Sequence, residues 1–205
     1  MKPYESLGVI GRFKPLHIGG ELMLKAVCGN AERAVIGIGS CNKHNMRNPF
    51  TPEETKGMID AVLAPKYSNY SIVFIPDFAH IPEFSDGQRW RKEIVGRFGT
   101  LDAFVSGDDY VSDLLKDDYR IIKPTELIRP EDYVFVRSTM VRVAMAKGED
   151  YSRMVSAQVS EYLERNGLVE RFRKEFGLQT LTSLADDAKI GHENKEEEKF
   201  HTMEE

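Results

Sequence analysis

Basic and imidazole side chains gather in one short stretch near the start of the sequence. The run Gly11-Arg12-Phe13-Lys14-Pro15-Leu16-His17-Ile18-Gly19-Gly20 directly follows an apolar segment. Arg12 and Lys14 carry positive charge, His17 offers a directed N–H donor, and the glycines allow a bulky anion to approach the backbone. A helix that starts near these glycines would aim its free N–H groups and its positive dipole end at the same place. The stretch therefore predicts a polyphosphate site.

A second stretch, Arg137-Ser138-Thr139-Met140-Val141-Arg142, carries similar chemistry. Thr139 is expected to cap a helix, and Arg142 then lies within the first turn of that helix. A hydroxyl, backbone N–H groups and a guanidinium converge on one anion in this arrangement. The alternative is an ordinary capped helix with a surface arginine.

The rest of the chain must supply the elements that position these groups. Short apolar runs alternate with helical patterns, and this alternation predicts an α/β fold with a doubly wound, mostly parallel sheet. In such sheets ligands bind beyond the carboxyl ends of the strands, which is where the first stretch lies. The expected strands are Leu7–Gly11, Ala34–Gly39, Ser71–Ile75, Ala103–Ser106 and Arg120–Ile122, and the expected helices are Gly20–Cys28, Pro52–Leu63, Gln88–Phe98 and Asp109–Leu115.

The pattern becomes helical in the last third of the chain. Three helices are expected at Thr139–Lys147, Ser152–Arg165 and Leu168–Phe176. We predict one domain over residues 1–177, with a helical part from about residue 138. Residues 178–205 are expected to form an acidic, disordered tail, since eight acids and three lysines lie in its last 21 residues.

Composition limits the class of protein. The chain has 205 residues, of which 41% are hydrophobic and 30% charged, as in soluble globular proteins. The net charge of −5 equals that of the acidic tail, so the remaining body is about neutral, which argues against a broad nucleic-acid surface. No membrane span is expected, and two cysteines favour a reducing, cytoplasmic setting.

Taken in order, the motifs resemble those of the HxGH-superfamily nucleotidyltransferases and are most similar to archaeal-type nicotinamide-nucleotide adenylyltransferases. The likeness extends from about Leu7 to Gly177. A single motif of this kind is modest evidence for the superfamily, whereas the whole set in the family's order is strong evidence for it. The matching segments are the first stretch, Gly39-Ser40, "NPFT" at 48–51, the single Trp90, "SGDD" at 106–109, "RSTMVR" at 137–142 and "KGEDYSRMV" at 147–155.

The resemblance implies that a nucleotide monophosphate attacks the α-phosphorus of ATP, and that pyrophosphate leaves. It implies a Rossmann-like fold, ATP with Mg²⁺, a phosphorylated acceptor such as nicotinamide mononucleotide and possible homo-oligomers. The spacing of the His, Cys and carboxylate residues predicts no protein metal site. Catalysis is assigned to Arg12, His17 and Arg142. The implied ATP-binding residues are Gly11, Arg12, Phe13, Lys14, His17, Gly19, Gly20, Ser138, Thr139 and Arg142, and the implied second-substrate residues are Ser40, Trp90 and Asp108.

Two positions depart from the family pattern. Gly20 stands where the family has its second histidine, and loss of such a donor typically costs roughly 100- to 1,000-fold in rate. Thr55 stands where the family usually has an arginine, and the adjacent Lys56 points about 100° away on a helix.

Three accounts of these departures stay open. The enzyme is active with Lys14, Lys43 or His44 supplying the donor, or it is a slow enzyme for a related substrate, by adenylyl or cytidylyl transfer to another phosphorylated acceptor such as a flavin, pantetheine or sugar-alcohol phosphate. Otherwise it binds nucleotide without turnover. A scaffold role for the acidic tail is a weaker alternative. No catalytic role is expected for His80, which follows the third strand in a loop that helps to form the acceptor pocket.

Overall fold

The computed structural model describes residues 2–183, and residues 184–205 of the predicted acidic tail lie outside the described part. Five parallel strands form one sheet in the order β3-β2-β1-β4-β5, so the predicted doubly wound α/β fold is confirmed. No helix within the described residues is long and apolar enough to cross a membrane. The strands are β1 Tyr4–Gly11, β2 Ala31–Gly39, β3 Tyr70–Ile75, β4 Ala103–Val105 and β5 Ile121–Ile122.

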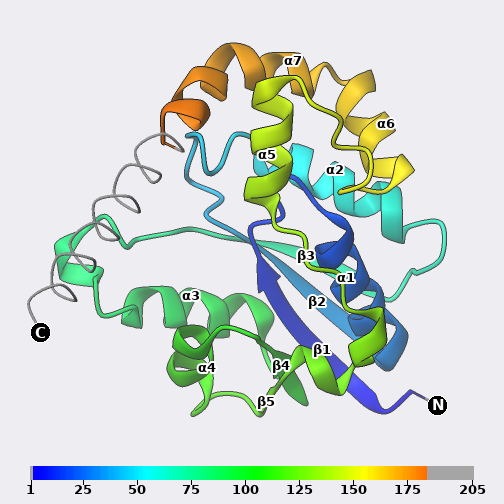
Figure 1. Cartoon of the computed structure of the whole chain (residues 1–205). Coiled ribbons are helices and arrows are strands. Elements are labelled where there is room, and N and C mark those ends of the chain that lie inside the picture. The colour runs from blue at the N-terminus through cyan, green and yellow to red at the C-terminus, as the bar shows by residue number, and fades with distance from the viewer. Residues whose placement is uncertain (1, 184–205) are drawn as a thin grey trace, which may run out of the picture.

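Helices cover both faces of the sheet (Figure 1). One face packs against α1, α2 and the helices of the last third of the chain, and the other packs against α3 and α4. The helices are α1 Ile18–Asn30, α2 Pro52–Leu63, α3 Gln88–Phe98, α4 Asp109–Leu115, α5 Ser138–Lys147, α6 Ala157–Arg165 and α7 Leu168–Phe172, with short 3₁₀ turns at Pro82–Phe84, Pro124–Glu126 and Pro130–Asp132.

The central strand β1 alternates between these two cores. Leu7 and Val9 are buried in the larger core, and Gly8 faces α3. A Cβ on Gly8 would lie 2.5 Å from Leu101 Cδ1, so only glycine lets the α3 layer approach this strand closely. The chain leaves β1 toward β2 on one side, and β4 pairs with β1 on the other. The sheet therefore has its switch point between β1 and β4, where ligands bind in open α/β sheets.

Helix boundaries were predictable where local capping decides them. Pro52–Leu63 is as predicted: Thr51 Oγ1 accepts from the Glu54 N–H at 3.1 Å, and Glu54 accepts in return from the Thr51 N–H. The first helix begins at Ile18, two residues earlier than expected, because His17 is its N-cap.

Two predictions in the helical part were wrong in detail. Thr139 is not the cap of α5: Arg137 holds that position, and Thr139 lies in the first turn. The segment from Ser152 does not begin a helix, which starts only at Ala157, because the Met154 carbonyl accepts the hydrogen bond of the Ile18 N–H at 3.0 Å. A backbone group of this loop is therefore used to complete the start of α1.

The last helix runs further than the sequence pattern indicates. Past α7 the chain forms a π-helical turn at Arg173–Gly177 and stays helical through Ser183. Residues 178–183, which we expected to begin the tail, are therefore helical, and Thr180 among them is buried.

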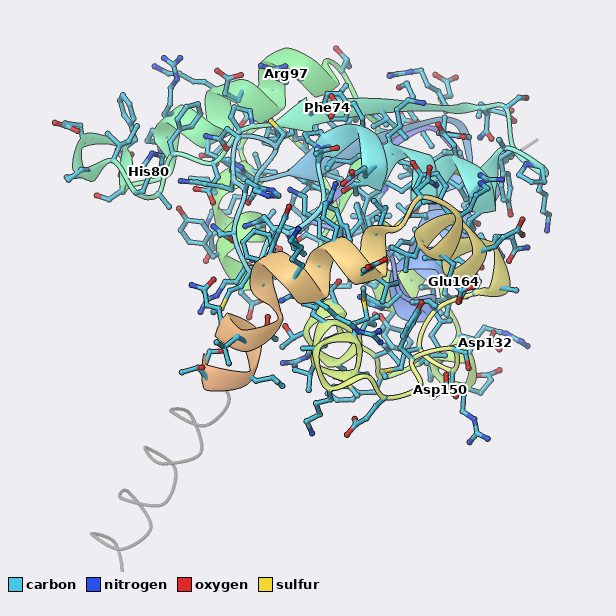
Figure 2. The ribbon with its side chains drawn as sticks, turned by 90° about the horizontal axis from the view of Figure 1, so that it is seen from above. Phe74, His80, Arg97, Asp132, Asp150 and Glu164 are labelled. Atoms are coloured by element: carbon cyan, nitrogen blue, oxygen red, sulfur yellow. The ribbon has the colours of Figure 1, made fainter. Side chains whose placement is uncertain are left out.

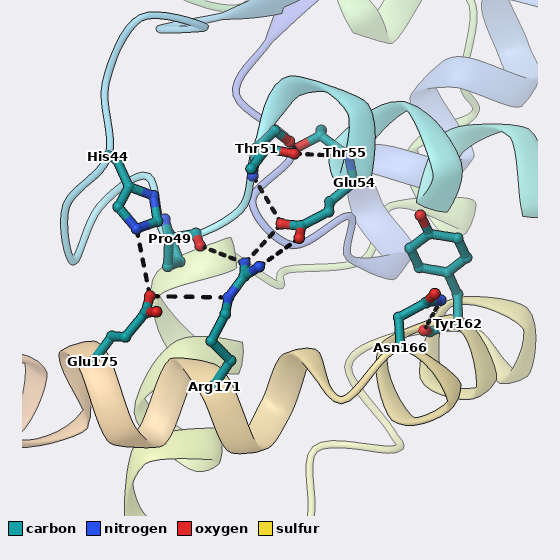
Figure 3. Close-up of polar contacts among 9 residues, drawn as sticks. All are labelled: His44, Pro49, Thr51, Glu54, Thr55, Tyr162, Asn166, Arg171 and Glu175. Carbon is teal, nitrogen blue, oxygen red and sulfur yellow. Dashed lines mark hydrogen bonds and ion pairs between the residues drawn. The ribbon is translucent and has the colours of Figure 1, made fainter.

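An ion-pair cluster ties this helix to the loop between β2 and α2 (Figure 3). Arg171 donates to both carboxylate oxygens of Glu54, at 2.5 and 2.7 Å, and to the Pro49 carbonyl at 3.1 Å. Glu175 lies 3.4 Å from His44 Nε2 and 3.8 Å from Arg171 Nε. Burial alone would raise the pKa of Glu54, but hydrogen bonds from Arg171 and the Thr51 backbone hold it below its usual value.

Candidate active site

Three neighbouring hollows lie at the carboxyl edge of the sheet. The switch-point hollow, of about 330 Å³, lies between β1, β4 and α1. The arginine hollow, of about 250 Å³, lies between the loop after β2, α5 and the last helix. The aromatic hollow, of about 480 Å³, lies beyond β1, β2 and β3. The principal lining residues are Val9, Phe13, His17, Gly20, Val105 and Gly107 for the first, Arg12, Arg47, Thr139, Arg142, Thr180 and Ser183 for the second, and Ser40, Asp77, Phe78, Phe84, Trp90, Asp108 and Tyr110 for the third.

Shared lining residues join the hollows. Arg12 lines both the arginine hollow and the aromatic hollow. Asp108 lines both the aromatic hollow and the switch-point hollow. The site is therefore one continuous surface, with the Arg12 side chain at the border between a cationic part and an aromatic part.

His17 is held by the helix that it caps. Its Nδ1 accepts a hydrogen bond from the Gly20 N–H at 3.2 Å, which assigns the proton of the neutral ring to Nε2. Burial lowers the pKa of His17 below its usual value, so the ring is neutral at pH 7. His17 lines the switch-point hollow, whereas Arg12 and Arg142 line the arginine hollow, so the three residues predicted to act together share no single hollow.

Arg142 is fixed from two sides. One terminal nitrogen donates to the Lys14 carbonyl at 2.8 Å, and the other donates to Thr139 Oγ1 at 3.1 Å. Only 7% of the residue is exposed. Burial, followed by the positive charges of Arg12 and Arg47, lowers the pKa of Arg142 to about 10, so the group stays cationic at neutral pH.

The arginine hollow is strongly cationic. Arg12, Arg47 and Arg142 line it together, and none of the three has a carboxylate within ion-pair distance in the part of the chain that the structure describes. Three guanidinium groups that repel one another gain most from an anion with several charges, such as a polyphosphate.

Lys14 does not line any of the three hollows, although the family motif suggested a phosphate contact. The side chain is fully buried, and its Nζ donates to the Ser40 carbonyl at 3.0 Å. Lys14 therefore joins the loop after β1 to the end of β2 rather than binding ligand. Burial lowers its pKa to about 8.

Other predicted residues divide between ligand-facing and structural positions. Phe13, Gly19 and Gly20 line the switch-point hollow, and Gly11 lines the aromatic hollow. Ser138 instead donates to the Pro15 carbonyl at 2.9 Å, and so joins the start of α5 to the loop after β1.

The candidate replacements for the missing donors have other partners. Lys43 Nζ lies 2.5 Å from His80 Nδ1, and His44 pairs with Glu175; neither lines a hollow. Figure 2 shows His80 on the protruding segment that follows β3. Thr55 is fully buried, and its hydroxyl donates to the Thr51 carbonyl at 2.8 Å.

The aromatic hollow contains all three residues predicted for the second substrate. Ser40 donates to the Asp77 carboxylate at 3.2 Å, Asp108 caps α4 by accepting from the Val111 N–H, and Trp90 forms part of the wall. Sequence reasoning missed the other aromatic rings of this hollow and Asp77.

Arg47 is the most important omission in the arginine hollow. Its position directly before the "NPFT" segment was the available signal, but an arginine in a surface loop has no periodic pattern that marks it. The fold brings it opposite Arg142 because the loop between β2 and α2 is anchored by Arg171, through the Pro49 carbonyl.

This protein has the Rossmann-like fold of nucleotidyltransferases. Its structure is similar to that of a bifunctional NMN adenylyltransferase/ADP ribose pyrophosphatase from Francisella tularensis, with a TM-score of 0.71 and 18% identity over 92% of this chain and 57% of that one. The same protein complexed with AMP and a manganese ion gives a TM-score of 0.64 and 20% identity, over 84% and 52%. This chain thus spans about half the length of those bifunctional chains, and the likeness shows the fold.

Curated sequences narrow the likeness to proteins named nicotinamide-nucleotide adenylyltransferase. That of Methanococcus maripaludis is 26% identical over 167 residues, 81% of this chain and 92% of that protein. Those of Methanococcus vannielii and Thermococcus kodakarensis are 28% and 26% identical, over 78% and 80% of this chain and 89% and 85% of theirs. The resemblance predicted from the motifs is confirmed. No family model matches the sequence.

The buried Lys14 predicts an unusual pH dependence of stability. Below about pH 8 the residue is charged in both the folded and the unfolded protein, and folding bears the cost of burying that charge. At higher pH the folded protein loses this proton while the unfolded chain keeps it up to about pH 10.4, so the free energy of unfolding rises. Relative to Lys14→Met, the wild type should gain on the order of 2 kcal/mol between about pH 7.5 and 10.5 in urea titrations. A constant difference across this range would contradict the burial of the amine.

Proposed function

We propose that this protein is an enzyme that transfers AMP from ATP to nicotinamide mononucleotide, which yields NAD and pyrophosphate. The observation that carries the proposal is that a hollow lined by aromatic rings and carboxylates shares Arg12 with a hollow lined by arginines. A phosphorylated cationic ring and a polyphosphate placed in these two hollows meet at that guanidinium. The names of the curated relatives support the same reaction.

The aromatic hollow suits the charge of the nicotinamide ring. In nicotinamide mononucleotide this ring is a pyridinium cation, which aromatic faces and carboxylates attract. Trp90 and Phe78 supply flat faces, and Asp77 and Asp108 supply negative charge. Pantetheine and sugar-alcohol phosphates have no cationic ring for these groups to recognise, so the hollow favours the nicotinamide nucleotide.

Nucleotidyl transfer requires that the two substrates be positioned and that the negative charge on the phosphates be stabilised. An oxygen of the acceptor phosphate attacks the α-phosphorus of ATP, and the bond from that phosphorus to the bridging oxygen breaks, so that pyrophosphate leaves with the electron pair. In our assignment His17 Nε2–H and Arg12 stabilise charge at the α-phosphate, and Arg47 and Arg142 hold the leaving phosphates. Such preorganised donors supply most of the catalytic effect in phosphoryl and nucleotidyl transfer.

A divalent cation fits this site as part of the nucleotide. Within residues 2–183 no group of three or more His, Cys, Asp or Glu side chains is placed to hold a metal ion. We propose that Mg²⁺ enters with ATP, since this ion usually keeps several waters and is held largely by substrate phosphates. Its chemical contribution is to neutralise phosphate charge.

The proposal extends to the setting of the protein. Cys28 and Cys41 are both free thiols, in keeping with a reducing cytoplasm. Assembly into homo-oligomers and the lack of a nucleic-acid partner stay predictions from the sequence.

Trp90 provides the first test, because it is the only tryptophan in the chain. We expect nicotinamide mononucleotide to change Trp90 fluorescence on titration, and the wild type to release pyrophosphate and form NAD from ATP. Trp90→Ala should raise KM for the acceptor by roughly 5- to 100-fold, as loss of one aromatic stacking partner does, with a smaller change for ATP. Trp90→Phe, which keeps a flat ring, is the matched control.

The result that would contradict this reading is NAD formation with unchanged Trp90 fluorescence and an unchanged KM in Trp90→Ala. Release of pyrophosphate with a flavin or pantetheine phosphate acceptor, and not with the nicotinamide nucleotide, would favour the related-acceptor alternative.

Gly20 favours a second candidate function, nucleotide binding without turnover. It lies in the first turn of α1 and lines the switch-point hollow. A Cβ at this position would meet Leu16 Cδ1 at 3.2 Å and Phe13 Cδ1 at 3.5 Å, so a side chain enters after a small shift of Leu16. Gly20→His should therefore restore the family's donor.

We expect Gly20→His to raise kcat for NAD formation by roughly 10- to 100-fold, because one preorganised donor is worth that much or more. Gly20→Ala places the same Cβ without the imidazole and should not raise it. If wild type and Gly20→His both bind ATP and nicotinamide mononucleotide yet form no NAD, the protein is a nucleotide-binding module. An active wild type with no gain in Gly20→His would show that the missing histidine does not limit the rate.

A further inference from the structure

The last helical segment brings a polar side chain to the arginine hollow that no motif predicts. Thr180 lines this hollow with Arg12, Arg47 and Arg142. Only 6% of Thr180 is exposed, and its Oγ1 is sealed from water with no hydrogen-bond partner. A buried hydroxyl without a partner is costly, and native proteins rarely keep one without a use.

The neighbouring hydroxyls show that a hydroxyl on this helix can donate its hydrogen bond to a backbone carbonyl of the same helix. Thr182 Oγ1 donates to the Leu178 carbonyl at 3.0 Å, and Ser183 Oγ donates to the Thr180 carbonyl at 2.9 Å. Of these three hydroxyls, only that of Thr180 is left without a backbone acceptor in the described chain, and it is the one that lies deepest.

The burial pattern of this segment is also the reverse of the usual preference for buried apolar side chains and exposed polar ones. Leu178 is 81% exposed, whereas Thr180, two residues later, is almost fully buried. The π-helical turn at Arg173–Gly177 precedes both residues, and one such turn rotates everything after it by about one residue, roughly 100°. An apolar residue therefore faces solvent while a threonine lines the cationic hollow, a local conflict typical of functional positions.

Other contacts fix the helix in this place. Arg173 Nε donates to the Met145 carbonyl at 2.6 Å, which attaches the π-helical turn to α5, the helix that carries Arg142. Arg171 attaches α7 to the loop that carries Arg47 (Figure 3). The last helix is thus anchored to two of the three elements that supply arginines to the hollow, and Thr180 lines the hollow beside them.

We propose that the Thr180 hydroxyl donates a hydrogen bond to the phosphate chain of the nucleotide, so that the C-terminal helix forms one wall of the phosphate site. This inference rests on the proposed function, which places the β- and γ-phosphates in the arginine hollow. A rotation about the Cα–Cβ bond exchanges Oγ1 with the methyl group and turns the hydroxyl toward the bound anion. The ligand then supplies the acceptor that the protein lacks.

The proposal predicts opposite effects on stability and on binding. Thr180→Val removes a hydroxyl without a partner and keeps the shape, so the Tm of the ligand-free protein should be unchanged or higher. Binding of inorganic tripolyphosphate, measured by titration calorimetry, should become about tenfold weaker or more, as expected for loss of a hydrogen bond to a charged group. Thr180→Ser keeps the hydroxyl and should bind within about threefold of the wild type.

The matched control is Thr182→Val. Thr182 is exposed and lies about 200° further around the same helix, so the same atomic change there should leave tripolyphosphate affinity unaltered. Unchanged affinity in Thr180→Val would overturn the proposal. A lower Tm in Thr180→Val, with affinity reduced equally in Thr180→Ser, would also overturn it and assign a packing role to the residue.

The readouts separate this inference from the proposed function. Tripolyphosphate binding needs no acceptor and no turnover, so the Thr180 result stands even if no NAD is formed. Conversely, NAD formation at wild-type KM for ATP in Thr180→Val would overturn the inference and leave the proposed function intact. Failure of the wild type to bind tripolyphosphate would overturn the inference. The proposed function would then be tested separately, by whether the wild type forms NAD.

Discussion

The gathering of Arg12, Arg47 and Arg142 around one hollow is the constraint on which the rest of the site depends. Like charges brought this close raise the energy of the ligand-free protein, and after burial, the larger cause, the charges of Arg12 and Arg47 lower the pKa of Arg142. Within the described residues no carboxylate relieves the repulsion. The arrangement is stable because each arginine is carried by a separately anchored element, and in our proposal a bound polyphosphate relieves the repulsion.

The anchors are polar contacts between segments that are far apart in sequence. The loop after β1 is held by Ser138 and Arg142, which donate to its carbonyl groups, and by the buried Lys14, which reaches the end of β2. The loop before α2 is held from the opposite side by Arg171. Arg142 thus does two things at once, since it lines the arginine hollow and also connects α5 to the loop after β1.

Much of this was predictable from the sequence, for physical reasons that differ between residues. The alternation of parallel strands and helices along the chain follows from hydrophobic periodicity. The start of α2 follows from local hydrogen bonds between Thr51 and Glu54 alone. Arg12, His17 and Arg142 were assigned from motif and spacing, and the structure places the two arginines in one hollow at the carboxyl edge of the sheet and His17 in another. The burial of Lys14 was not predictable, because its acceptor is a carbonyl 26 residues away. Thr180 was missed because residues 178–205 were expected to form a disordered tail, and because the π-helical turn before it changes which face of the helix is buried.

The central claim is that three arginines, two from loops and one from α5, bind one phosphate chain, and arginine side-chain NMR tests it most directly. The Nε–Hε signals of Arg12, Arg47 and Arg142, assigned through single Arg→Lys variants, should shift together on titration with tripolyphosphate and follow one common Kd. Shifts confined to other arginines, or three signals that move with unrelated affinities, would contradict a shared phosphate site.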